Sequence, residues 1–412
     1  MKLAIIGGGA AGYFTALTAA EKNPHAQIFI IEAGNKVLRK VRISGGGRCN
    51  LTHSCFEPQK LSTHYPRGSR ELRAAFHQWQ PRDTIEWFEK RGVKTKTEED
   101  GRVFPATNQS QTIINCLTNT SQKAGINLLL NNRLLSMKKW KQGWKLSLCS
   151  GRIIFADRVC LALGSLKGSD INNSITDLQH TVHPLLPSLF SFNLNPHPLS
   201  ELAGVSVENA TVQTLPEGKK QVGPILITHR GLSGPAVLKA SAWDAEELAK
   251  LNYKFEVSVN WIPSFSTAAL QIMFSKFRTE CPTQRVMQNP FAAIPKRLWQ
   301  QFVSLSQIEE NTTWAHLSRK QMLNLQMYLT KFRLPVNGKT TNKDEFVTCG
   351  GVCLKEVDFR TMESKKQNGL FFAGVCLNLD GITRVFNFQV AWTTGRIAGE
   401  AMRKSFEKPT SA

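Results

Sequence analysis

The amino-terminal segment, residues 1–32, reads MKLAIIGGGAAGYFTALTAAEKNPHAQIFIIE. Its first apolar run, Leu3–Ile6, predicts a short buried strand, and the helix-prone segment Tyr13–Lys22 follows it. A second apolar run, Ile28–Ile31, predicts another strand, which leads directly into Glu32. Strand, glycines, helix, strand and acid in this order predict a βαβ unit that binds a dinucleotide, and they place the chain in the α/β class.

Three glycines between the first strand and the helix carry this prediction. Gly7, Gly9 and Gly12 have the G-x-G-x-x-G spacing. The first allows a tight turn, the second lets the backbone approach a pyrophosphate, and the third lets the helix pack on the strand. The helix N-terminus, where Ala10 and Ala11 lie, offers free N–H groups to phosphates. A carboxylate at Glu32 could accept hydrogen bonds from an adenosine ribose; a glycine-rich turn without a ligand is the plainer alternative.

Length and cysteine usage limit the possible classes of protein. A chain of 412 residues is expected to form two or three domains. It has no run of about twenty apolar residues, which argues against a membrane span, and no signal peptide is expected before the first strand. The nine cysteines are scattered without paired C-x-x-C spacing, so we expect reduced thiols, no metal site and a cytoplasmic location.

The net charge is unusually positive. Lys and Arg number 52 against 31 for Asp and Glu, which gives +21. Such a balance favours polyanionic partners such as nucleic acid, because phosphate contacts release counterions and steer the encounter. A surface charged only for solubility is the alternative. The candidate phosphate contacts are Arg67, Arg70, Arg73, Lys138 and Lys139.

A second glycine-rich segment follows Glu32. Three consecutive glycines form a flexible loop whose bare backbone can approach a ligand. No strand leads into this loop, so we interpret it as a wall of the first site rather than as a second dinucleotide fingerprint. With the preceding Lys40, the predicted wall residues are Ser44, Gly45, Gly46, Gly47, Arg48, Cys49 and Asn50.

The composition changes from residue 184, where prolines become frequent. We therefore predict a discontinuous cofactor domain, residues 1–186 and 345–412, and an inserted domain, residues 187–344. The insert is expected to be β-rich over 187–262 and mainly helical over 263–333. Three short strands, Ile126–Leu130, Leu134–Trp140 and Trp144–Cys149, are typical of a meander attached to a nucleotide fold.

Seven segments in chain order resemble the BaiN/RdsA family of flavin-dependent oxidoreductases, and the Gly-Gly-Gly-Arg-Cys-Asn piece is specific. They are Gly7–Gly12 with Glu32, Ser44–Thr52, Gly101–Pro105, Thr228–Pro235, Thr348–Val352, Thr361–Lys365 and Gly369–Gly374. The resemblance implies a two-dinucleotide-binding (Rossmann-like) flavin domain that holds FAD, with an inserted β-barrel and a small helical lobe. Further cofactor contacts are then expected at Gly164, Gly374, Asn387 and Gln389.

The resemblance also implies an activity, the reduction of a uridine of large-subunit ribosomal RNA to dihydrouridine. Other relatives are linked to C=C reduction on bile-acid intermediates, so a flavin reductase of a small metabolite is the second hypothesis. Only one dinucleotide fingerprint is present, so NAD(P)H would have to dock transiently. A thiol is a plausible proton donor; the candidates are Cys49, beside Arg48, and His229. For each, a packing role is the alternative.

The chain departs from the family pattern at two turns. Val375 and Asn378 stand where the family usually has a glutamate and an aspartate. Arg384 and Val385 replace two glycines that would let the backbone approach the flavin ring. The change to Arg384 and Val385 motivates a third hypothesis, a relative that binds FAD or RNA without turnover. The oligomeric state is not indicated by the sequence.

Overall fold

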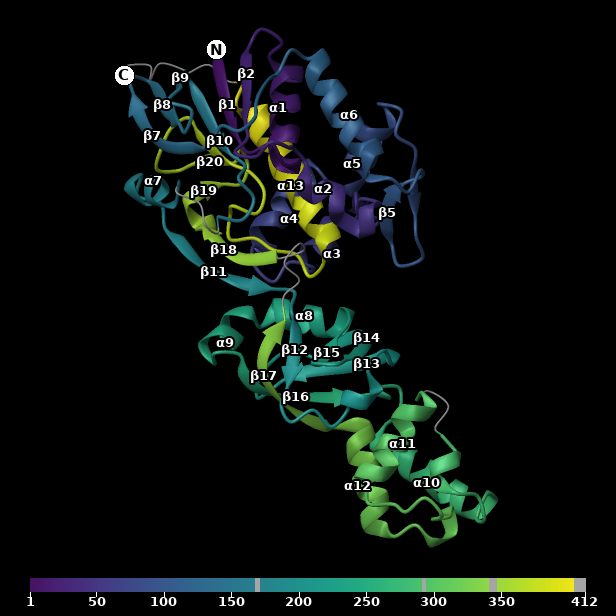
Figure 1. Ribbon diagram of the computed structural model, residues 1–412. Helices are drawn as coiled ribbons and strands as arrows, with labels where there is room; N and C mark the ends of the chain where they lie inside the picture. Colours follow the sequence, from purple (N-terminus) through teal and green to yellow (C-terminus); the bar gives the residue numbers. More distant parts are fainter. Residues whose placement is uncertain (167–170, 291–293, 341–346, 404–412) are drawn as a thin grey trace. The chain divides into compact units, whose positions relative to one another are not determined.

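The computed structural model describes residues 1–166, 171–290, 294–340 and 347–403, and it divides into two units (Figure 1). The first unit, here called the flavin domain, comprises Met1–Leu186 and Val347–Ala412; the second comprises Pro187–Phe346. The boundary expected at residue 345 lies outside the described residues. Among the described residues, no helix is long and apolar enough to cross a bilayer.

A seven-stranded sheet forms the centre of the flavin domain. Five neighbouring strands run parallel in the order β21-β10-β1-β2-β6, and β20 and β19 extend one edge antiparallel. The strands are β1 (Lys2–Ile6), β2 (Gln27–Ile31), β6 (Asn127–Leu129), β10 (Arg158–Leu161), β19 (Val357–Asp358), β20 (Glu363–Ser364) and β21 (Leu370–Phe372). The central strands are apolar and buried because helices cover parallel sheets on both faces.

Two helices far apart in sequence pack closely in this domain. Helix α1 (Ala10–Lys22) lies against α13 (Arg384–Ala401), which follows the sheet at the carboxyl end of the chain. A Cβ added to Gly395 would lie 2.7 Å from the carbonyl oxygen of Ala11, and one added to Gly399 would lie 2.5 Å from that of Thr15. Glycine at these positions therefore lets the two helix backbones approach each other.

The predicted meander differs from the observed one. The first predicted strand joins the central sheet as β6, parallel to β2, instead of the meander. The observed antiparallel meander comprises β7 (Leu134–Trp140), β8 (Gly143–Leu148) and β9 (Ile153–Ala156). The final strand escaped prediction because it is short and follows a turn that contains Gly151.

The remaining elements of the flavin domain surround the central sheet. A small sheet in the order β3-β5-β4 supports the loop that contains the three glycines, and β11 pairs with β18. The strands are β3 (Thr52–His53), β4 (Thr95–Thr97), β5 (Arg102–Pro105), β11 (Val182–Ser188) and β18 (Val347–Val352). The helices are α2 (Arg39–Ile43), α3 (Pro58–Ser62), α4 (Ser69–Gln78), α5 (Pro81–Glu89), α6 (Ser110–Lys123) and α7 (Ile171–Asp177).

The second unit is a closed barrel with a helical lobe, which confirms the predicted fold class. The barrel strands are β12 (Ser191–Leu194), β15 (Gly231–Ser233), β14 (Gln221–Thr228), β13 (Ser206–Thr214), β16 (Lys254–Asn260) and β17 (Phe332–Thr340). Its helices are α8 (Pro235–Trp243) and α9 (Ala245–Lys250), and the lobe contains α10 (Thr267–Glu280), α11 (Lys296–Leu305) and α12 (Arg319–Thr330). The predicted β-rich segment, residues 187–262, did not include β17, because this strand contains Pro335 and Gly338, and both residue types are uncommon in strands.

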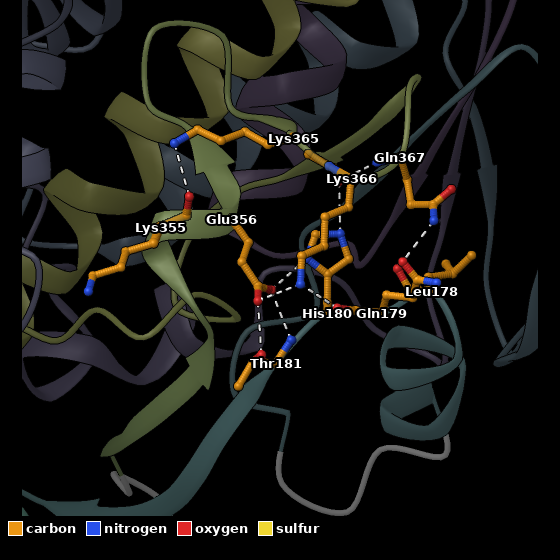
Figure 2. A network of polar contacts seen from close by, with 10 residues as sticks. Leu178, Gln179, His180, Thr181, Lys355, Glu356, Lys365, Lys366 and Gln367 are labelled. Carbon is orange, nitrogen blue, oxygen red and sulfur yellow. Dashed lines mark hydrogen bonds and ion pairs between the residues drawn. The ribbon is translucent and has the colours of Figure 1, made fainter.

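A partly buried polar network connects the segment before β11 to the edge of the central sheet (Figure 2). The carboxylate of Glu356 accepts hydrogen bonds from Lys366 Nζ at 2.6 Å and from the backbone N–H of Thr181 at 2.8 Å. His180 lies between Glu356 and Ser364, with its Nδ1 3.1 Å from the carboxylate and its Nε2 2.8 Å from the hydroxyl. Burial raises the pKa of Glu356, but the bonds from Lys366 and Thr181 outweigh burial and lower this pKa to about 2.

Replacement of Glu356 by Gln should reduce stability in a pH-dependent way. Because the folded-state pKa lies below the usual value of 4.5, the carboxylate stabilises the fold above about pH 4.5 and loses this effect as the pH falls towards 2. Glu356→Gln should lower the free energy of unfolding by up to about 3 kcal/mol at pH 7. Urea unfolding at several pH values measures this loss in free energy, and Glu99→Gln, at an exposed position, is the control. A loss that stays constant down to pH 2.5 would contradict this assignment.

Candidate functional site

The carboxyl ends of β1, β10 and β21 bring three predicted glycines to one edge of the sheet. Gly7 follows β1, and a Cβ on it would lie 2.3 Å from the carbonyl oxygen of Ala162 at the end of β10. Gly164 follows within the same turn, and Gly374, after β21, donates its N–H to Thr394 Oγ1 at 2.8 Å. In open α/β sheets, ligands bind at this edge.

The first glycine turn combines tight packing with open space. A Cβ on Gly12 would lie 1.9 Å from the carbonyl oxygen of Gly7, so any side chain there is excluded. A Cβ on Gly9 would meet nothing within 4 Å. Helix α1 begins at Ala10 with Ala11 next, and no side chain caps it, so its first N–H groups are available to an anion.

Glu32 holds two turns around this edge. Its Oε2 accepts a hydrogen bond from the N–H of Gly8 at 2.7 Å, and its Oε1 accepts one from the N–H of Gly34 at 2.8 Å. The carbonyl of Gly8 in turn accepts from the N–H of Leu38 at 2.8 Å. The acid therefore lies beside the glycine turn, where an adenosine ribose would have to bind.

The second glycine segment forms a 3-10 turn, η1 (Ser44–Gly47), with left-handed backbone. Gly45 and Gly46 have φ values of 60° and 68°, which favour glycine over residues with a Cβ. A Cβ on Gly46 or Gly47 would meet nothing within 4 Å. The glycines of this loop thus leave bare backbone beside open space.

Arg48 and Asn50 follow the glycines with different environments. The guanidinium of Arg48 pairs with Glu98 at 2.6 Å and lies 4.1 Å from the centre of the Phe104 ring, so it fixes the loop to β5. The side chain of Asn50 is buried, and its Oδ1 has no hydrogen-bond partner in the structure. A buried polar atom usually has a partner, so this oxygen is a candidate ligand contact.

The two candidate proton donors occupy different units. Cys49 is fully buried, and burial raises the pKa of its thiol to about 12, against the opposing effect of a hydrogen bond with Ser44. His229 is exposed in the turn between β14 and β15 of the second unit. The thiol is therefore protonated at neutral pH, and the imidazole faces solvent.

The other predicted cofactor contacts lie near the start of α13 and in α2. Asn387 closes the turn before the helix, with its Oδ1 accepting from the N–H of Gly381 at 3.0 Å. Gln389 is buried, and its Oε1 accepts from Thr52 Oγ1 at 2.6 Å and from Thr84 Oγ1 at 3.2 Å. Its amide thereby joins α13 to β3. Lys40 lies exposed on α2.

The predicted phosphate contacts do not form one cluster. Arg67 binds the buried carboxylate of Asp380, whereas Arg70 and Arg73 are exposed on α4. Lys138 is exposed on β7. Its neighbour Lys139 donates to the carbonyl of Asn368, and its Nζ lies 4.0 Å from the centre of the Trp144 ring. Arg67 and Lys139 are thus already engaged within the protein.

Sequence reasoning missed the residues that hold α13 in place. Thr52, Thr84 and Thr393 bind the amide of Gln389. Gly395 and Gly399 permit the close packing on α1, and their G-x-x-x-G spacing was a usable signal. Among the described residues, no group of three or more His, Cys, Asp or Glu side chains could hold a metal ion.

The residues present fit a dinucleotide cofactor. Gly9 and Gly46 line open space, which a side chain at either position would partly fill. The N-terminus of α1, which no side chain caps, lies beside Gly9, and the Oδ1 of Asn50 lacks a hydrogen-bond partner. Backbone N–H groups at such a helix end suit a pyrophosphate. FAD would thus be held by the glycine turn with Glu32 at one end and by Ser44–Asn50 at the other.

The two glycines of the first turn should respond differently to substitution. Gly9→Ala adds a methyl group to open space at a backbone φ of −90°, so the unliganded fold should keep its melting temperature. The methyl would occupy the pyrophosphate position, and FAD affinity should fall roughly tenfold or more, about 1.4 kcal/mol. Gly12→Ala should destabilise the fold itself, since overpacking costs about 1–3 kcal/mol or more.

FAD titration of the apoprotein and thermal unfolding measure these effects. The two variants are matched in chemistry and lie three positions apart, so each controls for the other. Gly9→Ala with undiminished FAD affinity would place the pyrophosphate elsewhere.

Comparison with known proteins places this architecture in a family. Residues 1–401 match the family described as the HI0933-like protein Rossmann domain. The chain is 31% identical to a ribosomal RNA dihydrouridine synthase of Escherichia coli, with 95% of each chain covered. It is 27% identical to a 3-dehydro-bile acid delta(4,6)-reductase of Clostridium scindens, with 97% of this chain and 98% of the relative covered.

A solved structure shares the fold at low sequence identity. The 3-ketosteroid-delta4-(5alpha)-dehydrogenase of Rhodococcus jostii RHA1 aligns over 98% of this chain and 96% of its own, with 12% identity and a TM-score of 0.50. This likeness supports the architecture alone. With the family match over nearly the whole length, it leads to one conclusion: the chain belongs to the HI0933-like family, whose members have a Rossmann-type flavin domain.

Proposed function

We propose that this protein is an FAD-dependent oxidoreductase that reduces a uridine of large-subunit ribosomal RNA to dihydrouridine, with NAD(P)H as the electron source. The observation that carries the cofactor assignment is the glycine-lined edge of the sheet, where Gly9 and Gly46 leave space and Asn50 Oδ1 lacks a partner. The substrate assignment rests on the 31% identical relative, named as a ribosomal RNA dihydrouridine synthase.

The charge of the chain is consistent with this substrate. A net charge of +21 favours phosphate contacts, and Arg70, Arg73 and Lys138 are exposed cations. A uridine within folded RNA would have to be flipped out or met in an open intermediate before its ring could reach a buried site. The protein would thus act on RNA that is locally unpaired.

In this proposal, the bound flavin would supply the hydride that the uracil C5=C6 bond accepts. The chain itself supplies the enclosure and the proton. Arg48, held by Glu98 and by the Phe104 ring, keeps the glycine loop in one conformation, so the wall is preorganised. Cys49 Sγ, protonated at neutral pH because burial raises the thiol pKa to about 12, is the first candidate donor, and His229 is the second.

Loss of the gene should remove dihydrouridine from ribosomal RNA. Mapping dihydrouridine in ribosomal RNA from cells with and without the gene measures this directly. We expect at least one large-subunit position to lose the modification and to regain it when the intact gene is restored, but not with the Gly9→Ala variant. An unchanged dihydrouridine map would reject the proposed substrate.

The proton donor can be tested with matched cysteine variants. If Cys49 donates the proton, Cys49→Ala should lower turnover by a factor of about 10² or more while the flavin spectrum stays unchanged. The control is Cys160, whose buried thiol lies 3.9 Å from Thr15 Oγ1 in the core. Cys160→Ala should retain turnover. Full activity of Cys49→Ala would remove it as the donor, and the same assay on His229→Ala would then test the imidazole.

A second candidate function is the reduction of a C=C bond in a small metabolite. The 27% identical relative, named as a 3-dehydro-bile acid delta(4,6)-reductase, favours it. In that case, unsaturated small ketones should oxidise the reduced protein rapidly, whereas ribosomal RNA fragments should not. Bound flavin that neither substrate class oxidises would instead support the third hypothesis, a binding protein without turnover, motivated by Arg384 and Val385.

A further inference from the structure

The three-stranded meander of the flavin domain has one buried and one exposed face. Trp144, Leu146 and Leu148 of β8 alternate inward and are buried. On the opposite side, Trp140 of β7 and Phe155 of β9 are 48% and 46% exposed. Large aromatic side chains that are half exposed within one small sheet contribute little to the core, so another role is expected of them.

The exposed aromatic side chains are arranged as a pair. Trp140 of β7 pairs in register with Gly143 of the central strand β8, which has no side chain, and Phe155 of β9 pairs with Lys145 of β8. The tryptophan therefore contacts Phe155 across the glycine, with ring centroids 5.6 Å apart and planes inclined by 45°. Lys145 Nζ lies 5.9 Å from the centre of the Trp140 ring.

Cations alternate with these rings on the same face. Lys138, Lys145 and Phe155 form one row across the three strands, and Ser136, Ser147 and Ile153 form the next. Residues 131–156 include six basic side chains and no acidic one; the basic residues are Arg133, Lys138, Lys139, Lys141, Lys145 and Arg152. A sheet surface with aromatic rings for bases and lysines for phosphates suits single-stranded nucleic acid.

We propose that this exposed face, here called the meander face, binds an unpaired stretch of RNA. Bases would stack on Trp140 and Phe155, and phosphates would contact Lys138 and Lys145. The choice of RNA rests on the proposed function; an anionic membrane is less suitable because the lysines lie between Trp140 and Ile153 instead of surrounding an apolar cluster.

The position of the meander face defines its contribution. Figure 1 shows β7, β8 and β9 on one side of the flavin domain, whereas α2 and β5, which flank the glycine loop, lie on the other side. The face therefore lies apart from the cofactor walls. It would anchor a long RNA away from the reacting base, so its loss should raise the KM for long RNA with little effect on kcat.

Two double variants test the proposal. Trp140→Ala with Phe155→Ala removes the rings, and Lys138→Gln with Lys145→Gln removes the charges but keeps the aromatic surface. The matched controls are Ile272→Ala and Lys320→Gln, which change exposed side chains on α10 and α12. The probe is a fluorescently labelled single-stranded fragment of ribosomal RNA, measured by anisotropy with the full-length protein at several salt concentrations.

The ring variant should bind the probe about tenfold more weakly or worse, since stacking on one aromatic side chain contributes about this much per base. The lysine variant should bind more weakly and with a salt slope smaller by about 1.4, since each phosphate contact to a single strand contributes about 0.7. The controls should match the wild type. Unchanged affinity in both double variants would overturn the proposal, as would vesicles of anionic phospholipid that bind the wild type but not the ring variant, with RNA binding unaffected.

The outcome is separable from that of the proposed function. RNA binding that depends on the meander face, in cells whose dihydrouridine map does not depend on the gene, would support this inference and reject the proposed reaction. Dihydrouridine formation by the ring variant with an unchanged KM for long RNA would support the reaction and reject the meander face.

Discussion

Helix α1 contacts two neighbouring segments backbone to backbone, at positions where a glycine leaves no room for a side chain. Towards β1, the position of Gly12 leaves less than 2 Å between a Cβ and the carbonyl of Gly7. Towards α13, Gly395 and Gly399 bring a second helix backbone against Ala11 and Thr15. Because backbone is less compliant than side chains, these contacts fix the helix axis and the direction of its N-terminus.

The same helix pair also places the distant glycine loop. Helix α13 binds the segment after this loop, since Trp392 Nε1 donates to the carbonyl of Leu51 at 2.9 Å and Gln389 accepts from Thr52. The turn at Gly9 and the loop at Gly46 are therefore both held by α1 and α13, although they are separated in sequence. One packing constraint locates both walls of the proposed cofactor site.

The sequence predicted those features that depend on local patterns. The strands around Gly7 and Glu32, the role of Gly12 in helix packing and the fold class were all accessible, because spacing and apolar runs determine them. Features that depend on pairing between distant segments could not be predicted from the sequence. The strand β17 completes the barrel, although a helical lobe separates it in sequence from the other barrel strands. The segment of β6 was predicted in the meander but pairs with the central sheet.

The candidate site shows the same division. Ser44–Asn50 could be identified from its glycines, whereas the partners of individual side chains could not. No local pattern indicates that Arg67 binds Asp380, more than 300 residues away, or that three threonines satisfy Gln389. Likewise, the exposure of Trp140 and Phe155 depends on which face of the meander packs on the domain, and only the structure shows it.

We propose that the glycine-lined edge of the sheet holds one FAD per chain. The most direct measurement is the visible absorption spectrum of the purified full-length protein after reconstitution with FAD, followed by heat release and identification of the bound molecule. We expect stoichiometric FAD that co-elutes with the wild-type protein, and a lower FAD occupancy in Gly9→Ala at the same limiting FAD concentration. Wild-type protein that keeps its fold and retains no flavin at saturating FAD would show that this edge of the sheet does not bind FAD.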